Sequence, residues 1–356
     1  MVRSSHVPRV HSARPLTVEA PREALGDVVT LTRHVYVRQN LDLPAPGVVA
    51  DRGAWELAIE GVARSAVLTL ADLQRRTTVT RRVVLECAGN GRELAGARFG
   101  EETPWGGGAT ACVDFTGTPV GDLVAELGGP VEGARYLTAL GADAEGRAPD
   151  PWPQRVERSV PLAIGLDAAL LAWTLNGEPL PLLHGGPLRL VMPGHYAVNS
   201  VKFLRRLALT GEQSDADIQR LRYRLGPVGV PASPEQPSLW ALRVKSMLCA
   251  PAAGAMVASG PVKVAGVAWS GAGPVLCVEL SADEGASWSE AELDEVVDPA
   301  AWRPFRGRLD LPPGRSLVVS RATDRAGAVQ PETSAPTHSG YAHHGWRALG
   351  LTLHAH

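Results

Sequence analysis

The residue whose chemistry stands out most in this sequence is Cys87, in the stretch VVLECAGNGR. An apolar β-branched run comes before it and a glycine-containing turn comes after it, which predicts a thiol at the end of a strand. A free thiol is mostly protonated at neutral pH, whereas a bound metal ion or a nearby arginine such as Arg92 favours the thiolate. The local sequence therefore indicates Cys87 as a candidate soft ligand for a metal ion.

The same stretch allows two other interpretations. Gly89, Gly91 and Gly96 could belong to a dinucleotide-binding loop. The third glycine is misplaced for G-x-G-x-x-G, however, and a glycine-rich loop follows where that motif requires a helix. Cys87 could instead be a buried cysteine that packs as a small apolar side chain. Spacing alone leaves this second alternative open.

A second group of chemically useful side chains lies in LNGEPLPLLHGGPLRLVMPGHYAVNSVKFLRRLAL, where His184, Arg189 and Lys202 follow one another around a predicted strand. An imidazole, a guanidinium fork and an ammonium group could together bind a phosphorylated cofactor. Each of the three also has an ordinary structural explanation. Lys202 is the only lysine before residue 245 in a chain that otherwise uses arginine. Arg38, in HVYVRQN, gives no signal by itself.

The elements that must position these side chains change character along the chain. Residues 25–223 mix strand-like and helix-like runs at irregular, glycine-rich spacing, which predicts a mixed α+β domain rather than regular βαβ repeats. Residues 224–240 contain four prolines and two glycines and predict an extended linker. Residues 241–356 alternate with a period of two and predict an antiparallel, immunoglobulin-like β-sandwich. Residues 1–24 are basic, and a flexible arm is expected there.

Composition narrows the class of protein. The chain has 356 residues and a formal net charge of −2, which argues against a nucleic-acid-binding protein that works through bulk attraction. Cys87, Cys112, Cys249 and Cys277 contain no CxxC pair and predict no disulfide framework. No secretory signal and no run of about 20 apolar residues is visible, so a cytoplasmic protein without a membrane span is expected.

The C-terminal histidines are a further candidate metal site. They have irregular spacing and no thiolate near them: His338, His343, His344, His354 and His356. Structural zinc sites have more regular ligand spacing. These histidines are therefore interpreted as surface and strand residues.

The order and separation of these segments resemble the sulfite oxidase family. VVLECAGNGR is similar to the family's cysteine motif, and NGEPLPLLHGGPLRL followed by PGHYAVNSVKFLRRL is similar to its long pterin-binding segment. The resemblance continues through YVRQN, PWGGGATACVDFTG and VERSVPL into the C-terminal β domain, over roughly residues 30 to 350. One short motif would be weak support, whereas these segments in this order are specific.

The resemblance implies a molybdenum–molybdopterin cofactor whose metal is bound by the Cys87 sulfur. It implies further cofactor contacts from Tyr36, Arg38, Gln39, Asn40, Asp143, His184, Arg189, Ser200, Val201 and Lys202. Arg38, Arg92 and Trp105 match residues that line the family's substrate anion pocket. Tyr223 matches a tyrosine near the oxo group of the metal.

The activity that the resemblance implies is oxidation of sulfite to sulfate by oxygen-atom transfer, with the redox chemistry supplied by the cofactor. Reduction of nitrate or of a sulfoxide on the same cofactor is the alternative, and a non-catalytic pterin-binding or interaction module is a remote one. The family's C-terminal domain mediates dimers, so a homodimer is expected. No C-x-x-C-H occurs, so no haem is expected in this chain, and a separate acceptor such as a cytochrome would take the electrons.

Two positions depart from the family pattern. Arg38-Gln39-Asn40 stands where the family usually has Arg-Asn-His, so one pterin contact is expected to change character. Ser339, in THSGYAHHGW, stands where the family often has a second substrate arginine. This second departure weakens the inference to sulfite specifically and keeps nitrate open.

Overall fold

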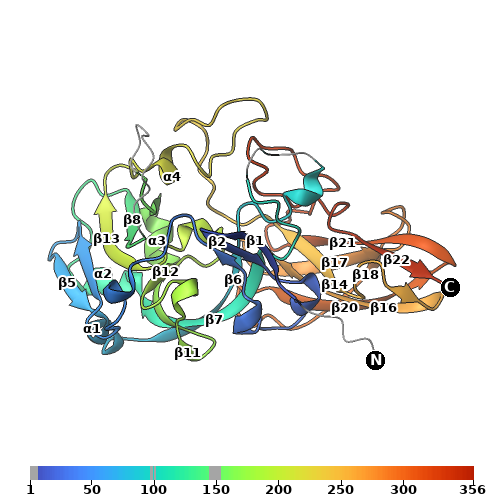
Figure 1. Cartoon of the computed structure of the whole chain (residues 1–356), viewed down its shortest axis with the longest axis horizontal. Helices are drawn as coiled ribbons and strands as arrows, with labels where there is room; N and C mark the ends of the chain where they lie inside the picture. Colours follow the sequence, from blue (N-terminus) through green and yellow to red (C-terminus); the bar gives the residue numbers. More distant parts are fainter. Residues whose placement is uncertain (1–6, 97–98, 100–101, 144–153) are drawn as a thin grey trace.

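The computed structural model describes residues 7–96, 99, 102–143 and 154–356. Strands predominate and the helices are few and short, as Figure 1 shows. A three-stranded sheet and two five-stranded sheets contain the strands before residue 211, and a four-stranded and a five-stranded sheet contain those after residue 244. The prediction of a mixed α+β chain is confirmed, with much more strand than helix.

The first large sheet carries the strand that leads to Cys87. Its order is β11-β10-β7-β6, with β12 also paired to β10. Its strands are β6 (Val79–Glu86), β7 (Thr110–Pro119), β10 (Leu170–Leu175), β11 (Glu178–Pro179) and β12 (Arg189–Val191). Val84 packs in one apolar cluster, and Val83 and Leu85 pack in another. Since side chains alternate across a strand, both faces of β6 are buried and its end delivers Cys87 into the interior.

The second large sheet has the order β5-β4-β13-β8-β9. Its strands are β4 (Glu56–Glu60), β5 (Ala66–Thr69), β8 (Tyr136–Gly141), β9 (Glu157–Pro161) and β13 (Leu204–Thr210). β4 and β13 are parallel, and the other pairs are antiparallel. β13 follows directly in the chain after the segment with His184, Arg189 and Lys202. Because β13 is the central strand of this sheet, it fixes the end of that segment there.

Short helices join the strands. The α-helices are α1 (Leu70–Gln74), α2 (Val120–Glu126), α3 (Leu162–Ala168) and α4 (Asp217–Arg220). Single 3-10 turns lie at Arg22–Ala24, Thr32–His34, Pro46–Val48, Glu93–Ala95, Leu182–His184 and Ala197–Asn199. Thr69 and Asp72 form a capping box that starts α1, because each side chain accepts a hydrogen bond from the other's backbone N–H. The helix-like runs expected between residues 25 and 223 include TLADLQRR and PVGDLVAELG, which contain α1 and α2.

The C-terminal part consists of two sheets around one apolar core, at one end of the molecule (Figure 1, orange to red). The first sheet has the order β14-β16-β20-β19: β14 (Lys245–Ala250), β16 (Gly260–Trp269), β20 (Arg303–Leu311) and β19 (Glu292–Leu293). The second has the order β15-β22-β21-β17-β18: β15 (Met256–Val257), β22 (Leu351–Ala355), β21 (Gly314–Asp324), β17 (Val275–Ser281) and β18 (Ser289–Glu290). Val262 and Val264 alternate with exposed neighbours along β16, as the period of two predicts.

Residues 7–24 include two paired strands and a 3-10 turn, so the prediction of a flexible arm is wrong for them. β1 (Arg9–Ala13) pairs with β2 (Leu16–Glu19), and β2 pairs with β3 (Val37–Arg38). The buried Glu19 carboxylate accepts hydrogen bonds from the backbone N–H groups of Gly106, Gly107 and Gly108 at 2.8, 2.9 and 2.8 Å. These partners lie far away in the sequence, which is why local composition did not reveal them. Residues 1–6 lie outside the described residues.

The proline-rich segment 224–240 folds back on itself instead of running as an extended linker. Leu225 N donates to Pro237 O, and Leu239 N donates to Tyr223 O, both at 2.9 Å. The largest apolar cluster contains residues from both sides of this segment. It joins Leu239 to Met247, Trp269 and residues of the two five-stranded sheets before residue 211. The two halves of the chain are therefore packed against each other rather than tethered.

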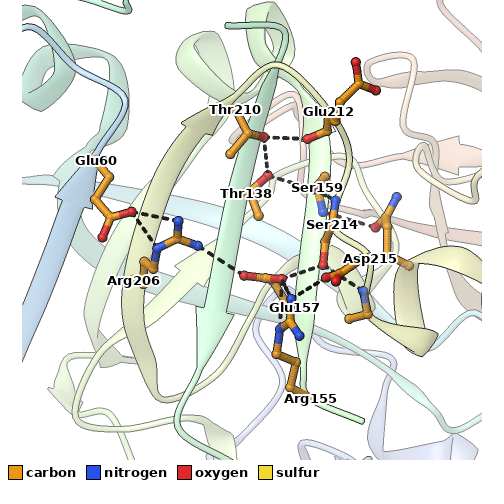
Figure 2. Close-up of polar contacts among 12 residues, drawn as sticks. Glu60, Thr138, Arg155, Glu157, Ser159, Arg206, Thr210, Glu212, Ser214 and Asp215 are labelled. Carbon is orange, nitrogen blue, oxygen red and sulfur yellow. Dashed lines mark hydrogen bonds and ion pairs between the residues drawn. The ribbon is translucent and has the colours of Figure 1, made fainter. Parts of the chain in front are cut away.

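A polar cluster centred on Glu157 lies on the second large sheet (Figure 2). The buried Glu157 accepts hydrogen bonds from Arg155 at 2.8 Å, Arg206 at 3.3 Å and Ser214 Oγ at 2.5 Å. Ser214 N donates to Ser159 Oγ at 2.9 Å. This network holds the loop that leads through α4 to Tyr223.

Glu19→Ala should destabilise the fold strongly. It removes the single oxygen that accepts three backbone N–H groups, and each buried donor without a partner costs roughly 1–3 kcal/mol. We expect urea unfolding to give a free energy of unfolding lower by about 3 kcal/mol or more. Glu23→Ala, at an exposed position of the same segment, is the matched control and should change little. A loss below about 1 kcal/mol for Glu19→Ala would show that this contact is not needed.

Candidate active site

One cavity gathers the residues that the sequence predicted for cofactor binding. It lies between the end of β6 and the segments around β3, β12 and β13. The predicted cofactor residues among its lining are Tyr36, Arg38, Gln39, Asn40, Cys87, Asp143, His184, Arg189, Ser200, Val201 and Lys202, and Tyr223 also lines it. Segments separated by more than a hundred residues thus meet around one space. Among the described residues, Arg92 and Trp105 are the predicted site residues that lie beside this cavity rather than in its lining.

Cys87 lines the cavity and is 9% exposed. Its N–H donates to Ala109 O at 2.9 Å, and Asn90 N–H donates to its carbonyl at 2.9 Å. Burial raises the pKa of Cys87, and the backbone hydrogen bond of Gly89 and the charges of Arg92 and Arg38 oppose this rise. A metal cation at the sulfur would favour the thiolate far more strongly than these groups do.

Several groups that can carry a positive charge also line the cavity: Arg38, His184, Arg189 and Lys202. Arg189 donates to His184 O at 2.9 Å, and Lys202 Nζ donates to Arg38 O at 2.9 Å. Burial lowers the pKa of Arg189 to about 10, and it lowers that of His184 to about 3 with the help of the charges on Lys202 and Arg189. Burial also lowers the pKa of Lys202. Burying these groups together disfavours their charged forms, and an anion bound between them would offset that cost.

Asp143 supplies a test of whether a pterin would fit. Its Oδ2 atom is buried and has no hydrogen-bond partner among the described residues. Burial raises the pKa of Asp143, and the charge of Lys202 opposes this shift. A buried acceptor without a donor is costly, and the N–H groups of a pterin ring are donors of the required kind. Together with the cations, this fits a group with an amide-like ring and a phosphate.

Two of the predicted substrate residues, Arg92 and Tyr223, both contact the ring of Tyr341. The Arg92 guanidinium lies 5.4 Å from the ring centroid of Tyr341, and that ring stacks on Tyr223 with 5.1 Å between centroids. Arg92 donates to Ser339 O at 2.8 Å and to Thr103 O at 2.6 Å. Its remaining nitrogen lies 3.3 Å from a Glu102 carboxylate oxygen. Arg92 is thus held in place by groups that neutralise part of its charge.

Trp105 and Asn40 also have definite partners here. Trp105 is buried and packs edge-on against Tyr36, with ring centroids 6.1 Å apart. The Tyr223 hydroxyl donates to Asn40 Oδ1 at 3.1 Å. Asn40, which departs from the family pattern, therefore accepts a hydrogen bond from Tyr223, the predicted catalytic tyrosine.

A loop from the C-terminal part closes the site. Ala342 N donates to Ala88 O at 2.9 Å, directly beside Cys87. His343 lies against Gly91, which has a φ of +89°, and a side chain at position 91 would start 2.8 Å from the His343 ring. Only glycine suits this position, because both the conformation and the close packing exclude a Cβ atom. Ser339 faces Arg92 with its backbone carbonyl.

Sequence reasoning missed several residues of the site: Glu19, Glu102, Arg158 and Tyr341. Arg158 is 1% exposed, donates to Asn199 Oδ1 at 3.1 Å and lies 5.7 Å from the Tyr223 ring centroid. The stretch VERSVPL contains this arginine, so the family resemblance could have marked it. Tyr341 is two residues from Ser339 and could have been found in the same way, whereas the Glu19 and Glu102 contacts have no local signal.

The C-terminal histidines do not converge. Within the described residues, no group of three or more His, Cys, Asp or Glu side chains has the arrangement of a metal site. His343 is buried against Gly91, in the turn that follows Cys87, whereas His354 lies on β22. None of the helices in the described ranges has the length and apolar character needed to cross a lipid bilayer.

Comparison with known proteins identifies the family. Residues 43–218 match the oxidoreductase molybdopterin binding domain, and residues 236–349 match the Mo-co oxidoreductase dimerisation domain. The sulfite oxidase of Gallus gallus is 32% identical over 350 residues, which cover 92% of this chain and 74% of that protein. This chain belongs to the sulfite oxidase family of molybdopterin oxidoreductases.

Other relatives show the breadth of the family. Mitochondrial sulfite oxidase of Mus musculus is 32% identical over 346 residues, and the chain spans 62% of the length of that relative. The NADPH nitrate reductase of Aspergillus niger is 32% identical over 351 residues, and the chain covers 39% of it. The crystal structure of sulfane dehydrogenase SoxCD from Paracoccus pantotrophus has a TM-score of 0.81 and 27% identity, covering 99% of this chain and 91% of that one.

Lys202→Met should leave the fold intact but reduce the molybdenum content of the purified protein. Lys202 Nζ reaches two backbone carbonyls at the cationic part of the cavity, so its loss removes an anion-binding charge without exposing core. We expect about 10-fold less molybdenum per chain after expression in a host that makes the cofactor. Metal analysis by mass spectrometry measures this. Lys263→Met, at an exposed position of β16, is the control, and equal metal content in both variants would contradict the assignment.

Proposed function

We propose that this protein is a molybdopterin-dependent oxidoreductase that oxidises sulfite to sulfate and passes the electrons to a separate acceptor such as a cytochrome. The observation that supports this best is the common cavity of Cys87, the cationic groups and the unpartnered Asp143 oxygen. Cys87 would bind the metal, and Arg189, Lys202, His184 and Asp143 would bind the pterin and its phosphate.

When bound, the molybdenum cofactor supplies oxygen-atom transfer and takes up the electrons. The task of the chain is to bring an anion next to it. Arg38 and Arg92 would bind the substrate oxygens through charge-assisted hydrogen bonds, each contributing roughly 1.5–3 kcal/mol. The Tyr223 hydroxyl donates its one hydrogen to Asn40 Oδ1 in this structure, and after turning away from Asn40 it would donate to an oxygen of the substrate or of the departing sulfate. Trp105 and Tyr341 would keep water away from the other sides.

Nitrate reduction is the second candidate, because relatives named nitrate reductase align over most of this chain. The Ser339 departure and the partial neutralisation of Arg92 by Glu102 are compatible with an anion of lower charge than sulfite. Sulfoxide reduction and a non-catalytic pterin-binding role have no separate support. The first curated relatives and the structural neighbour with TM-score 0.81 are named for the oxidation of sulfur compounds, which favours sulfite.

We also propose that the chain forms a homodimer through its C-terminal domain, since residues 236–349 match a dimerisation domain. The two sheets around a single core support the immunoglobulin-like assignment of this domain. We further propose domain limits at residues 25–223 and 241–356 and a cytoplasmic location.

Cys87→Ser should abolish turnover while leaving the fold intact. Changes to the surroundings of a metal ligand cost about 10–100-fold in activity, so loss of the ligand itself should cost at least about 100-fold. Sulfite-dependent reduction of a dye, with molybdenum analysis on the same samples, measures this. Cys277→Ser, on β17 away from the cavity, is the control. Undiminished turnover in Cys87→Ser would refute the proposed function.

Glu102→Gln should lower the KM for sulfite. The Glu102 carboxylate competes with an anionic substrate for Arg92, at 3.3 Å, and its side chain is 40% exposed. Releasing an ion pair of this exposure, about 0.5–1 kcal/mol, should lower KM by roughly two- to fivefold. Steady-state kinetics with Glu93→Gln as control provides the comparison, since Glu93 pairs instead with Arg9. A KM that stays the same or rises would show that Arg92 does not bind the substrate.

A further inference from the structure

A fully buried ion pair joins the C-terminal part of the chain to the end of β6, the strand that leads to Cys87. Lys245, the first residue of β14, donates through its ammonium group to Glu86, the last residue of β6. Both side chains are 1% exposed. Trp269 Nε1, on β16, donates to the other Glu86 carboxylate oxygen at 2.9 Å. Glu86 directly precedes Cys87, so two residues of the C-terminal part reach the immediate neighbour of the predicted metal ligand.

Glu86 passes this contact on to the turn that follows Cys87. Asn90 Nδ2 donates, at 3.1 Å, to the Glu86 oxygen that also accepts from Lys245. Asn90 Oδ1 accepts a hydrogen bond from Ala109 N at 3.0 Å. Asn90 N donates to Cys87 O at 2.9 Å, and Cys87 N donates to Ala109 O at 2.9 Å. The Asn90 side chain thus closes the turn at one end, and its own orientation is fixed by Glu86.

Stability alone does not require this arrangement. Two charges removed from water lose their solvation, and apolar side chains of similar volume at such positions are often equally or more stabilising. The Lys245 ammonium lies 5.8 Å from the Trp269 ring centroid, and Met247 and Trp269 belong to the same apolar cluster as Val84. What an ion pair adds is direction, because the carboxylate must face the ammonium, the indole and the Asn90 amide at once.

We propose that Lys245 is a positioning residue: through Glu86 and Asn90, it fixes the turn that holds the Cys87 sulfur at the cofactor cavity. The C-terminal domain is then part of the active site as well as a dimerisation module. The inference rests on the proposed role of Cys87 as metal ligand. It assigns no contact with substrate or cofactor to Lys245 itself.

The test compares two double variants that both remove the buried charges. Glu86→Gln/Lys245→Met keeps an oxygen that can accept from Asn90 but loses the ammonium group that directs it, so we expect a kcat between those of wild type and the next variant. A wild-type kcat in this variant would show that Lys245 does not position the turn. Glu86→Leu/Lys245→Met fills the same space with apolar atoms but leaves Asn90 without its partner. In this variant we expect a similar melting temperature, a kcat about 10-fold or more below wild type with unchanged KM for sulfite, and a shifted thiolate-to-metal absorption band. Ser246→Ala is the control, because Ser246 is buried on the same strand but bonds to Gln330 and Ser320.

Cofactor-free protein supplies an independent readout. Cys87 should react with iodoacetamide several-fold faster in Glu86→Leu/Lys245→Met than in wild type, measured on the Cys87 peptide by mass spectrometry. Asn90→Ala, which keeps the ion pair, should reproduce the shifted band and the faster alkylation if the double variant does not fold.

Wild-type kcat, absorption band and alkylation rate in both Glu86→Leu/Lys245→Met and Asn90→Ala would overturn the inference. Wild-type protein that shows the metal band but does not oxidise sulfite would refute the proposed activity alone, because the band and the alkylation rate do not depend on the substrate. The two failures are therefore distinguishable.

Discussion

Two hydrogen bonds to Ala109 hold the turn on which the whole site depends. Ala109 O accepts from Cys87 N, and Ala109 N donates to Asn90 Oδ1. They continue the pairing of β6 with β7 beyond the last residue of the strand, so the turn remains attached to the sheet. The sulfur consequently faces the cavity, and Arg92 returns toward the Tyr341 ring. A strand that frayed at this point would separate the proposed metal ligand from the proposed substrate residues.

The cavity on which this turn opens is electrostatically unfavourable in the protein alone. Arg189 and Lys202 are buried close to each other and to Arg38, and burial lowers the pKa of both. Sheet pairing and backbone carbonyls hold the groups there, since both cations donate to carbonyl oxygens. An anionic cofactor with N–H donors would satisfy the cations and the Asp143 oxygen together. Buried ionisable groups with shifted pKa values, gathered in one cavity, are typical of a binding site.

Residues inside continuous segments could be predicted from the sequence, and contacts between distant segments could not. Cys87 and the segment from His184 to Lys202 carry their signal in local order and spacing, and the structure brings them to one cavity. Glu19 sits in a segment that looks like a loose arm, because its partners, the N–H groups of three glycines, are more than eighty residues away. In the sequence, Lys245 stands out only because lysine is rare in this chain. Its partner Glu86 belongs to the other domain, so no local pattern connects the two residues. The proline-rich segment predicted a linker, but Leu239 anchors it in the core.

The assignment of the site depends on Cys87 binding molybdenum in this cavity. X-ray absorption at the molybdenum edge of the purified wild-type protein, with Cys87→Ser prepared in parallel, measures the ligands of the metal. We expect a sulfur neighbour of the metal, in addition to those of the pterin, that is present in the wild type and absent from the variant. Molybdenum with identical sulfur coordination in both proteins, or no molybdenum in the wild type, would contradict it.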